Sequence, residues 1–205
     1  MMETTRDHPV TLCDVIRPDG THARGLRVFC SRRSQSVDLD TCGACPRLVR
    51  VCEDASGSVA CIRCSPGTAA TLDPAEVAVG ALIAGQVSAV RNDVPDHAIR
   101  ALFVKHSLSL VVVVDEDHRV IGVVREADLI HRGFASPEVA ESAGEIMRPA
   151  LSICEDTPIR AALLQMANSR VRHAPVVTTA GELIGTLIDI VGLRWLRGVG
   201  VGTDG

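Results

Sequence analysis

The strongest constraint on how this chain can fold is an internal repeat with a period of 63 residues. Residues 91–130, RNDVPDHAIRALFVKHSLSLVVVVDEDHRVIGVVREADLI, align without a gap on residues 154–193, CEDTPIRAALLQMANSRVRHAPVVTTAGELIGTLIDIVGL. The alignment matches Asp93 with Asp156 and Gly122 with Gly185. A sequence that occurs twice predicts the same local structure twice.

Each copy carries the pattern of a strand, a helix, two strands and a second helix. An aspartate that can cap a helix, followed two residues later by a proline suited to the first turn, marks each helix start. Apolar residues at helical spacing come next, and then two β-branched runs joined by a polar turn. The predicted strands are residues 87–90, 111–114 and 120–124 in the first copy and 151–153, 175–177 and 183–187 in the second.

Three motifs carry a family resemblance: D-x-P at each helix start, HAPVV at 173–177 and GVVREADL at 122–129. With them, about residues 79–195 resemble a tandem pair of cystathionine-β-synthase-type (CBS) domains, or Bateman module. The resemblance implies an α/β (α+β) fold in which two β-α-β-β-α repeats form a pseudo-two-fold pair with two clefts. Such pairs often hold adenosine derivatives, commonly form homodimers and usually regulate rather than catalyse, so we expect no enzyme.

The resemblance also implies a ligand site for AMP, ADP, ATP or S-adenosylmethionine. The family pattern after the third strand is G-h-h-[S/T]-x-x-D, where h is apolar. The first repeat keeps Asp128, which would contact ribose, and replaces the hydroxyl residue with Arg125, which could grip phosphate. The second repeat has Ile188 and Val191 at those places, so we expect at most one nucleotide per chain. The expected ligand-binding residues are Gly122, Val124, Arg125, Asp128, His173, Ala174 and Pro175.

Several of these residues also have a structural interpretation that stays open. Gly122 could serve close backbone packing, as glycines in strands often do. Arg125 and Asp128 could face solvent, and His173 could be a half-buried residue at the junction of a helix and a strand.

Cysteines set the first part of the chain apart. Seven of the eight lie in the first 64 residues, and two C-x2-C pairs with fifteen residues between them match the spacing of a tetrahedral zinc site. We therefore expect a structural zinc that stabilises a small ribbon-like β domain. The two pairs are one possible ligand set, and Cys30 with the first pair and one cysteine of the second is another. The candidate ligands are Cys30, Cys42, Cys45, Cys61 and Cys64.

These patterns predict how the chain is divided. Residues 10–66 would form the zinc-ribbon-like domain, and SPGTAATLDP indicates a linker, which we place at 67–76. The repeats would occupy 77–135 and 140–197, and a flexible tail would follow at 198–205.

Composition restricts the partners. The chain has 46% hydrophobic and 22% charged residues and a formal charge of −4, which is typical of a soluble globular protein. We expect a cytoplasmic protein without a leader peptide or membrane span, because the most membrane-like run, 77–90, has only fourteen residues. The expected partners are a small adenosine ligand, a second copy of the chain and a protein docked on the zinc domain, not nucleic acid.

Two other functions remain open at this point. The cysteine-rich domain could act as a nucleic-acid adaptor, and binding that weakens steeply with salt would support this. Cys42 and Cys45 could form a redox dithiol, although the apolar strand that usually precedes such a C-x-x-C pair is missing. The basic residues available to the adaptor are Arg17, Arg24, Arg27, Arg32 and Arg33. The sequence contains no Ser/His/Asp arrangement, phosphate-binding P-loop or dinucleotide fingerprint.

Overall fold

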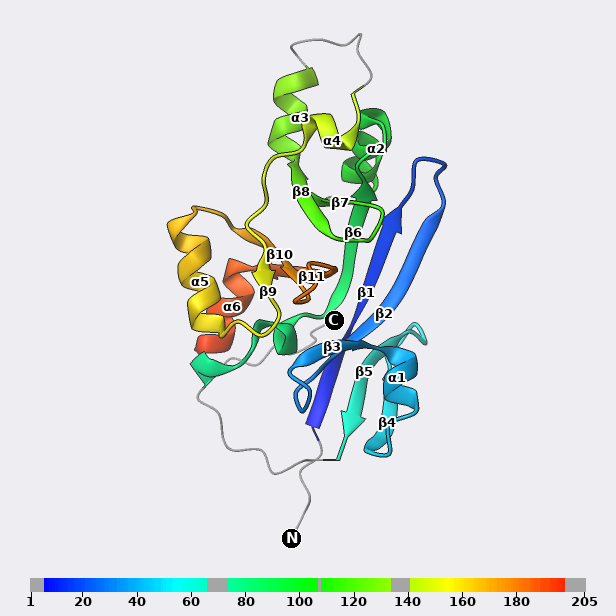
Figure 1. The fold of residues 1–205 in the computed structure, drawn as a ribbon, viewed down its shortest axis with the longest axis vertical. Coiled ribbons are helices and arrows are strands. Elements are labelled where there is room, and N and C mark those ends of the chain that lie inside the picture. The colour runs from blue at the N-terminus through cyan, green and yellow to red at the C-terminus, as the bar shows by residue number, and fades with distance from the viewer. Residues whose placement is uncertain (1–5, 66–73, 107, 134–140, 198–205) are drawn as a thin grey trace.

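The computed structural model describes residues 6–65, 74–106, 108–133 and 141–197. Within these ranges the chain forms a mixed α+β fold with two sheets. Figure 1 shows an elongated molecule, with the first repeat at the top, the second at the left and the N-terminal strands running along the right. The linker predicted at 67–76 lies mostly outside the described residues, and the predicted tail lies wholly outside them.

Both repeats have the predicted order of strand, helix, strand, strand and helix. The first comprises β6 (Gly85–Arg91), α2 (Asp96–His106), β7 (Leu110–Val114), β8 (Val120–Arg125) and α3 (Glu126–Gly133). The second comprises β9 (Ile153–Cys154), α5 (Ile159–Asn168), β10 (His173–Val177), β11 (Leu183–Ile188) and α6 (Asp189–Leu196). Three short helices lie between the larger units: η1 (Pro74–Glu76), η2 (Val79–Leu82) and α4 (Ala143–Ile146).

The start of the second repeat differs from the prediction in two details. Its first strand, β9, begins at Ile153, two residues later than predicted. Helix α5 has Pro158 rather than Asp156 at its N-cap, and no side chain caps it. A tertiary contact serves the first turn instead: the backbone N–H of Ile159 donates to Val77 O at 2.9 Å.

The cysteine-rich segment consists of five strands and one short helix. They are β1 (Arg6–Ile16), β2 (His22–Cys30), β3 (Gln35–Asp38), α1 (Leu39–Gly43), β4 (Leu48–Glu53) and β5 (Val59–Cys64). Strand β1 is central: residues 6–9 pair with β5, and residues 10–16 pair with β2. Residues 11–16 also pair in parallel with residues 85–90 of β6, giving the strand order β3-β2-β1-β6-β7-β8. Main-chain hydrogen bonds therefore cross the boundary predicted between this segment and the first repeat.

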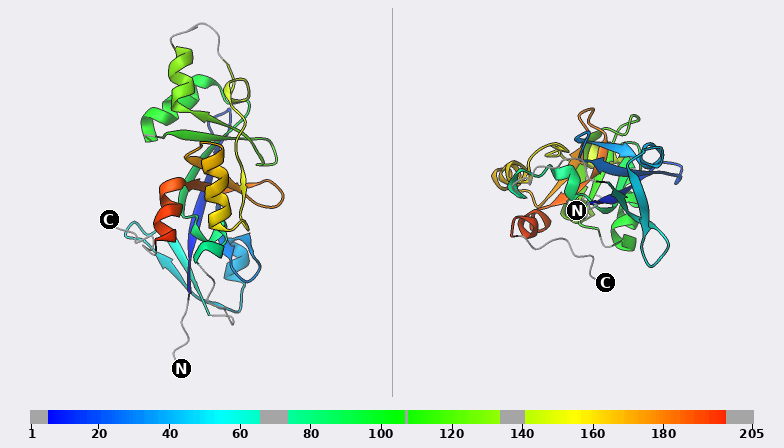
Figure 2. Two further views of the ribbon diagram at one scale, coloured as in Figure 1. Left: turned by 90° about the vertical axis from the view of Figure 1, so that its left-hand side faces the viewer. Right: turned by 90° about the horizontal axis from the view of Figure 1, so that it is seen from below.

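The two faces of this shared sheet enter different cores. One face packs under the helices of the first repeat, where Ile16 and Val90 meet Ile99 and Phe103. The other face, which carries Cys13, packs against Leu183 of the second repeat. Helices α5 and α6 lie side by side over the second sheet, as Figure 2 shows, and enclose a core of their own. A fourth, smaller cluster within the cysteine-rich segment comprises Val10, Val28, Cys42 and Ile62.

Equivalent turns join the two repeats. His118 and Gly181 correspond under the 63-residue shift, and both have left-handed backbones, with φ of 62° and 86°. The N–H of Leu183 donates to His118 O at 3.2 Å, and the N–H of Val120 donates to Gly181 O at 3.1 Å. Each repeat thus bonds to the same turn of the other, which gives the pair its pseudo-two-fold character.

Candidate functional site

Asp128 is the best-placed charged residue of the predicted ligand site. It lies in the first turn of α3, directly after β8, and its side chain is only 5% exposed. Arg125 donates to both carboxylate oxygens, at 3.0 and 3.2 Å, and Arg148 donates through Nε to Oδ1 at 2.7 Å. The two arginine side chains are 50% and 59% exposed. The site is therefore a buried carboxylate with two guanidinium groups at its surface.

The arginines decide the charge state of this carboxylate. Burial alone would raise the pKa of Asp128, but the hydrogen bonds and charges of Arg125 and Arg148 outweigh it and hold the pKa below its ordinary value. Asp128 is thus ionised at neutral pH. An ionised carboxylate accepts hydrogen bonds only, which suits it to bind ribose hydroxyls or basic groups.

Gly122 and Val124, on β8, pack closely against neighbouring residues. A Cβ atom on Gly122 would lie 2.6 Å from Met147 Sδ and 2.9 Å from Arg148 O, so only glycine fits here. The next residue, Val123, exchanges two backbone hydrogen bonds of 2.9 Å with Arg148. The Val124 side chain is fully buried in the core of the first repeat. Any contact of Val124 with a ligand would have to use its backbone.

The predicted ligand residues of the HAPVV motif, His173, Ala174 and Pro175, lie on β10 near the first repeat. His173 Nε2 lies 3.5 Å from the hydroxyl of Ser109, whose neighbour Leu110 pairs with Arg125 across β7 and β8. His173 is half-buried, and burial lowers its pKa below the ordinary 6.5. Ala174 and Pro175 are buried in β10. The two predicted groups of residues therefore approach each other through Ser109.

The second repeat differs at the place equivalent to the Asp128 site. Ile188 ends β11 and Val191 lies in α6, both half-buried. The carboxylate nearest in sequence, Asp189, pairs with the exposed Arg172 at 3.4 Å. The arrangement of a buried carboxylate beneath two arginines is thus found in the first repeat.

The candidate zinc ligands fall on two faces of β5. Cys61 and Cys64 are three residues apart on one strand, and side chains of a strand alternate, so the two thiols point to opposite faces. Cys64 packs with Cys42 in the small core, whereas Cys61 lies opposite Cys52 of β4. Burial raises the pKa of Cys42, and the nearby thiols of Cys64, Cys30 and Cys45 raise it further. Cys64 therefore lies on the face of β5 that carries the small core, near Cys30, Cys42 and Cys45, and Cys61 lies on the other face.

Cys61 belongs to a second group. The ligand atoms of Asp7, Cys52 and Cys61 all lie within 4.8 Å of one another. The carboxylate of Asp7 already accepts two hydrogen bonds from Arg63, at 2.6 and 2.7 Å. Burial, followed by a hydrogen bond with Cys52, raises the pKa of Cys61 to about 11.

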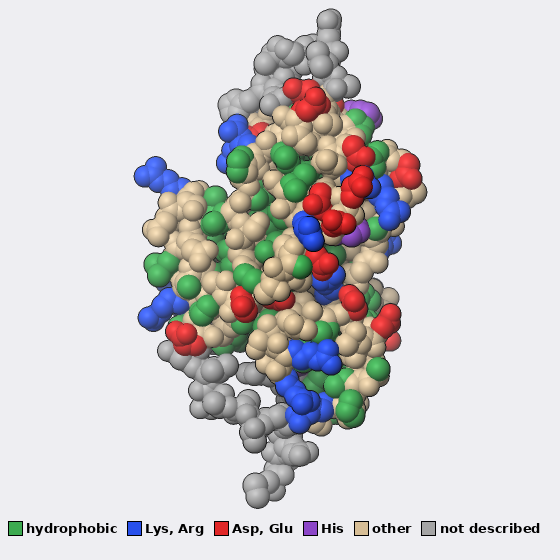
Figure 3. Space-filling view, viewed as in Figure 1, with side chains coloured by type: hydrophobic (Ala, Val, Ile, Leu, Met, Phe, Trp, Pro, Cys, Tyr) green, Lys and Arg blue, Asp and Glu red, His purple; other side chains and the backbone are tan. Residues whose placement is uncertain are grey.

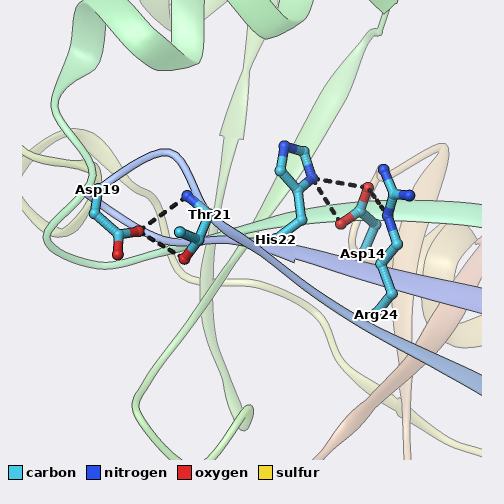
Figure 4. Close-up of polar contacts among 5 residues, drawn as sticks. All are labelled: Asp14, Asp19, Thr21, His22 and Arg24. Atoms are coloured by element: carbon cyan, nitrogen blue, oxygen red, sulfur yellow. Dashed lines mark hydrogen bonds and ion pairs between the residues drawn. The ribbon is translucent and has the colours of Figure 1, made fainter.

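Sequence analysis missed two buried carboxylates: one joins the consecutive strands β1 and β2, and the other joins two segments far apart in sequence. Asp14, on β1, is 4% exposed and binds two side chains of β2: His22 Nδ1 at 2.9 Å and Arg24 Nε at 3.3 Å, as Figure 4 shows. Glu155, 1% exposed, accepts the backbone N–H of Ser36 at 2.6 Å. Neither belongs to a recognisable sequence motif, because the contacts depend on how β1 pairs with β2 and on how β3 meets the segment after β9.

Glu155 lines the larger of two clefts between the cysteine-rich segment and the repeats. This polar cleft has a volume of about 470 Å³ and lies between β3 and the 178–182 turn. A smaller one of about 210 Å³ lies beside it, against β2 and His118. An ion pair of 3.0 Å between Arg27 and Glu182 separates them, and both residues line both clefts.

The surface offers little support for binding to the phosphate backbone of a nucleic acid. Two of the five arginines in the basic stretch, Arg24 and Arg27, form ion pairs with Asp14 and Glu182. Figure 3 shows basic and acidic side chains intermixed on the face drawn there. In the part of the chain that the structure describes, every helix is too short or too polar to cross a bilayer.

Comparison with known proteins supports the repeat. The CBS domain family matches residues 87–134 and 143–189. An uncharacterized 17.7 kDa protein of Acidianus ambivalens is 29% identical over 82 residues, 40% of this chain and 49% of that protein. Protein MK0525 of Methanopyrus kandleri is 28% identical over 92 residues, 42% of this chain and 47% of that protein. The chain spans about half the length of the curated relatives it matches.

Solved structures share the fold of the pair. CBS domain protein PAE2072 from Pyrobaculum aerophilum, complexed with AMP, is 22% identical with a TM-score of 0.53, covering 60% of this chain and 95% of that one. The cytosolic domain of the Mg²⁺ channel MgtE, in complex with ATP, is 26% identical with a TM-score of 0.51, covering 58% and 48%. The CBS domain pair of protein MJ0100, with 5-methylthioadenosine and S-adenosyl-L-methionine, is 18% identical with a TM-score of 0.51, covering 60% and 97%.

The fold and the internal repeat agree with these matches: residues 87–134 and residues 143–189 each match the CBS domain family, one after the other.

Proposed function

We propose that the chain is a regulatory protein whose CBS pair binds one adenosine nucleotide or derivative at the Asp128 site. The observation that carries the proposal is the buried, ionised Asp128 beneath two half-exposed arginines, one on β8 and one in the segment between the two repeats. A ligand with both ribose hydroxyls and phosphates matches this charge pattern. Arg125 and Arg148 would turn from the carboxylate to the phosphates, and Asp128 would then accept from the ribose.

The neighbouring structures support the class of ligand. PAE2072 is complexed with AMP, the MgtE domain with ATP, and the MJ0100 pair with S-adenosyl-L-methionine. All contain an adenosine group. A nucleoside derivative without phosphates would use only part of this site, so we expect phosphorylated adenosines to bind more tightly than S-adenosylmethionine.

A thermal-shift screen of the full chain against AMP, ADP, ATP and S-adenosylmethionine tests the proposal. A ligand at about 100 times its dissociation constant should stabilise the native state by about 2.7 kcal/mol. Inosine and guanosine nucleotides at the same concentrations are the matched controls for the base. Equal shifts for all purines, or none for any adenosine ligand, would contradict the proposed site.

The proposal extends to a structural zinc held by Cys30, Cys42, Cys45 and Cys64. The donor set fits, since four thiolates are the ligands of closed structural zinc sites. The positions of these cysteines also suit a shared metal. Cys42 lies in α1 and Cys45 in the turn after it, Cys30 ends β2, and Cys64 ends β5. The sulfurs would draw together to about 3.8 Å, as tetrahedral zinc with bonds of about 2.3 Å requires. The metal would fasten these four elements around the small core.

The same segment is placed to pass the ligand state of the pair to a docked protein. Three contacts connect them: the β1–β6 pairing, the Ser36–Glu155 hydrogen bond and the Arg27–Glu182 ion pair. The first two contacts involve main-chain groups, so a shift of the repeats would move β1 and β3 with them. We assign the segment a role in docking a protein partner on that basis.

Self-association through the helices of the second repeat completes the proposal. Helices α5 and α6 expose large apolar side chains, which a second copy would cover. They are Leu164, Ile190, Leu193 and Leu196. Light scattering should give the mass of a dimer for the parent chain and of a monomer for Leu193→Glu. A monomeric parent at micromolar concentration would contradict this part.

A further inference from the structure

Cys52 and Cys61 form a pair distinct from the zinc candidates. They are directly opposite each other in the antiparallel β4–β5 ladder, and their sulfur atoms lie within 4.8 Å of each other. Opposed residues of such a ladder have Cα atoms about 4.5–5.5 Å apart, which is the range that a disulfide spans. The pair can therefore be joined without moving either strand.

The surroundings of this pair favour a disulfide over a metal ion. Arg50 of β4 lies opposite Arg63 of β5. Each arginine is two residues from the cysteine on its own strand, so its side chain is on the same face of the sheet as that cysteine. The third potential ligand, Asp7, is already bound by Arg63 through two hydrogen bonds. A divalent cation would sit beside two guanidinium groups and compete for a neutralised carboxylate. The guanidinium groups instead attract an anionic oxidant, and the charge of Arg63 offsets part of the rise that burial causes in the pKa of Cys61.

Both cysteines are open to a small reagent. Cys52 and Cys61 are half-buried, and β4 pairs with β5 along one side only in the described sheet. Cys64, three residues along β5, faces the opposite side and packs in the small core. An oxidant that reaches Cys61 is thus on the other side of the sheet from the four grouped thiols.

We propose that Cys52 and Cys61 are a reversible redox site that forms a cross-strand disulfide with a small anionic disulfide such as oxidised glutathione. In the reaction the thiolate of one cysteine attacks the oxidant, a mixed disulfide forms and one reduced thiol leaves. The second cysteine then attacks the mixed disulfide, and a second reduced thiol leaves. Two protein thiols are oxidised, one disulfide is reduced to two thiols, and the two protein protons pass to the departing thiolates. The bond would lock β4 to β5, and through β5 the start of β1.

Peptide mapping of the oxidised full chain tests the proposal. Cleavage after arginine places Cys52 and Cys61 together in residues 51–63, VCEDASGSVACIR, and Cys42 and Cys45 together in residues 34–47. After oxidised glutathione and then alkylation, peptide 51–63 should lose the mass of two hydrogens and carry no alkyl group. Peptide 34–47 should carry two alkyl groups. Dithiothreitol should restore alkylation of 51–63.

The variants separate this site from other oxidations. Cys52→Ser and Cys61→Ser should each abolish the intrapeptide bond, and Cys154→Ser, which removes a distant thiol, should leave it unchanged. Full alkylation of 51–63 after oxidation, a stable glutathione adduct on either cysteine, or a disulfide formed first in 34–47 would each overturn the proposal. Because the decisive readout is made on the parent chain, a variant that fails to fold does not weaken the test.

Discussion

Arg148 donates to Asp128 at 2.7 Å and so joins the segment between the two repeats to α3, the last helix of the first repeat. Arg125 donates to the other carboxylate oxygen of Asp128, Oδ2, at 3.0 Å. One buried charge therefore holds the segment between the repeats to the first repeat, and it orients the two guanidinium groups that we propose bind phosphates.

The first prediction concerns stability. Asp128→Asn should lower the free energy of unfolding by about 1–3 kcal/mol, because it replaces one of the two accepting oxygens with an NH2 donor and leaves two arginines without their charge partner. Chemical denaturation at neutral pH measures the change. Asp189→Asn breaks a more exposed pair in the second repeat and should cost less than about 1 kcal/mol. Equal losses for both variants would show that Asp128 is not the structural link.

The second prediction tests the close approach at Gly122. Gly122→Ala should destabilise the chain by about 1–3 kcal/mol, because its methyl group would meet the backbone oxygen of Arg148, which cannot swing aside. Gly25→Ala is the matched control, since a Cβ there meets nothing within 4 Å. Thermal unfolding of both variants gives the comparison, and an unchanged Tm for Gly122→Ala would refute the packing described for Val123 and Arg148.

The third prediction is a pH dependence from His173. Burial lowers its folded pKa below the ordinary 6.5, so the unfolded chain binds the proton more strongly. The stability is fully present above pH 6.5 and is lost as the pH falls through the folded pKa. His173→Gln should remove this loss, so its Tm should fall less than that of the parent on acidification from pH 7.5. His97→Gln, at an exposed position on α2, should behave like the parent. Parallel Tm profiles for parent and His173→Gln would contradict the burial effect.

The fourth prediction separates the two zinc ligand sets. Cys64→Ser should lose stoichiometric zinc in elemental analysis, because it removes one of the four grouped thiols. Cys61→Ser should retain the metal, because its thiol points to the other face of β5. Loss of zinc from both variants would favour the two C-x2-C pairs, and a parent chain without zinc would refute the metal site altogether.

Sequence alone could predict the repeated units but not how they are joined to the rest. The 63-residue repeat and the β-branched runs are local signals, and they led to the correct order of strands and helices in both copies. The pairing of residues 11–16 with 85–90 depends on strands far apart in sequence, so no local pattern reports it. The aspartate cap predicted for α5 at Asp156 was wrong: Pro158 is at the N-cap, and the N–H of Ile159 donates to Val77, a contact between distant segments that no local pattern reports.

The candidate site shows the same limit. Asp128 and Arg125 were found because they occupy a motif, whereas Arg148 reaches Asp128 from twenty residues away and has no motif of its own. Cysteine spacing predicted a metal site without deciding its ligands. Once β5 is known to be a strand, alternation alone places Cys61 and Cys64 on opposite faces.

The most direct test of the account is calorimetric titration of the full chain with the nucleotide that gives the largest thermal shift. We predict one site per chain and an affinity about ten- to a hundred-fold lower for Asp128→Ala, because a buried ribose hydroxyl without its acceptor costs about 1–3 kcal/mol. Asp189→Ala, the control in the second repeat, should bind like the parent. Two equivalent sites per chain, no binding of any adenosine ligand, or unchanged affinity for Asp128→Ala would contradict the assignment.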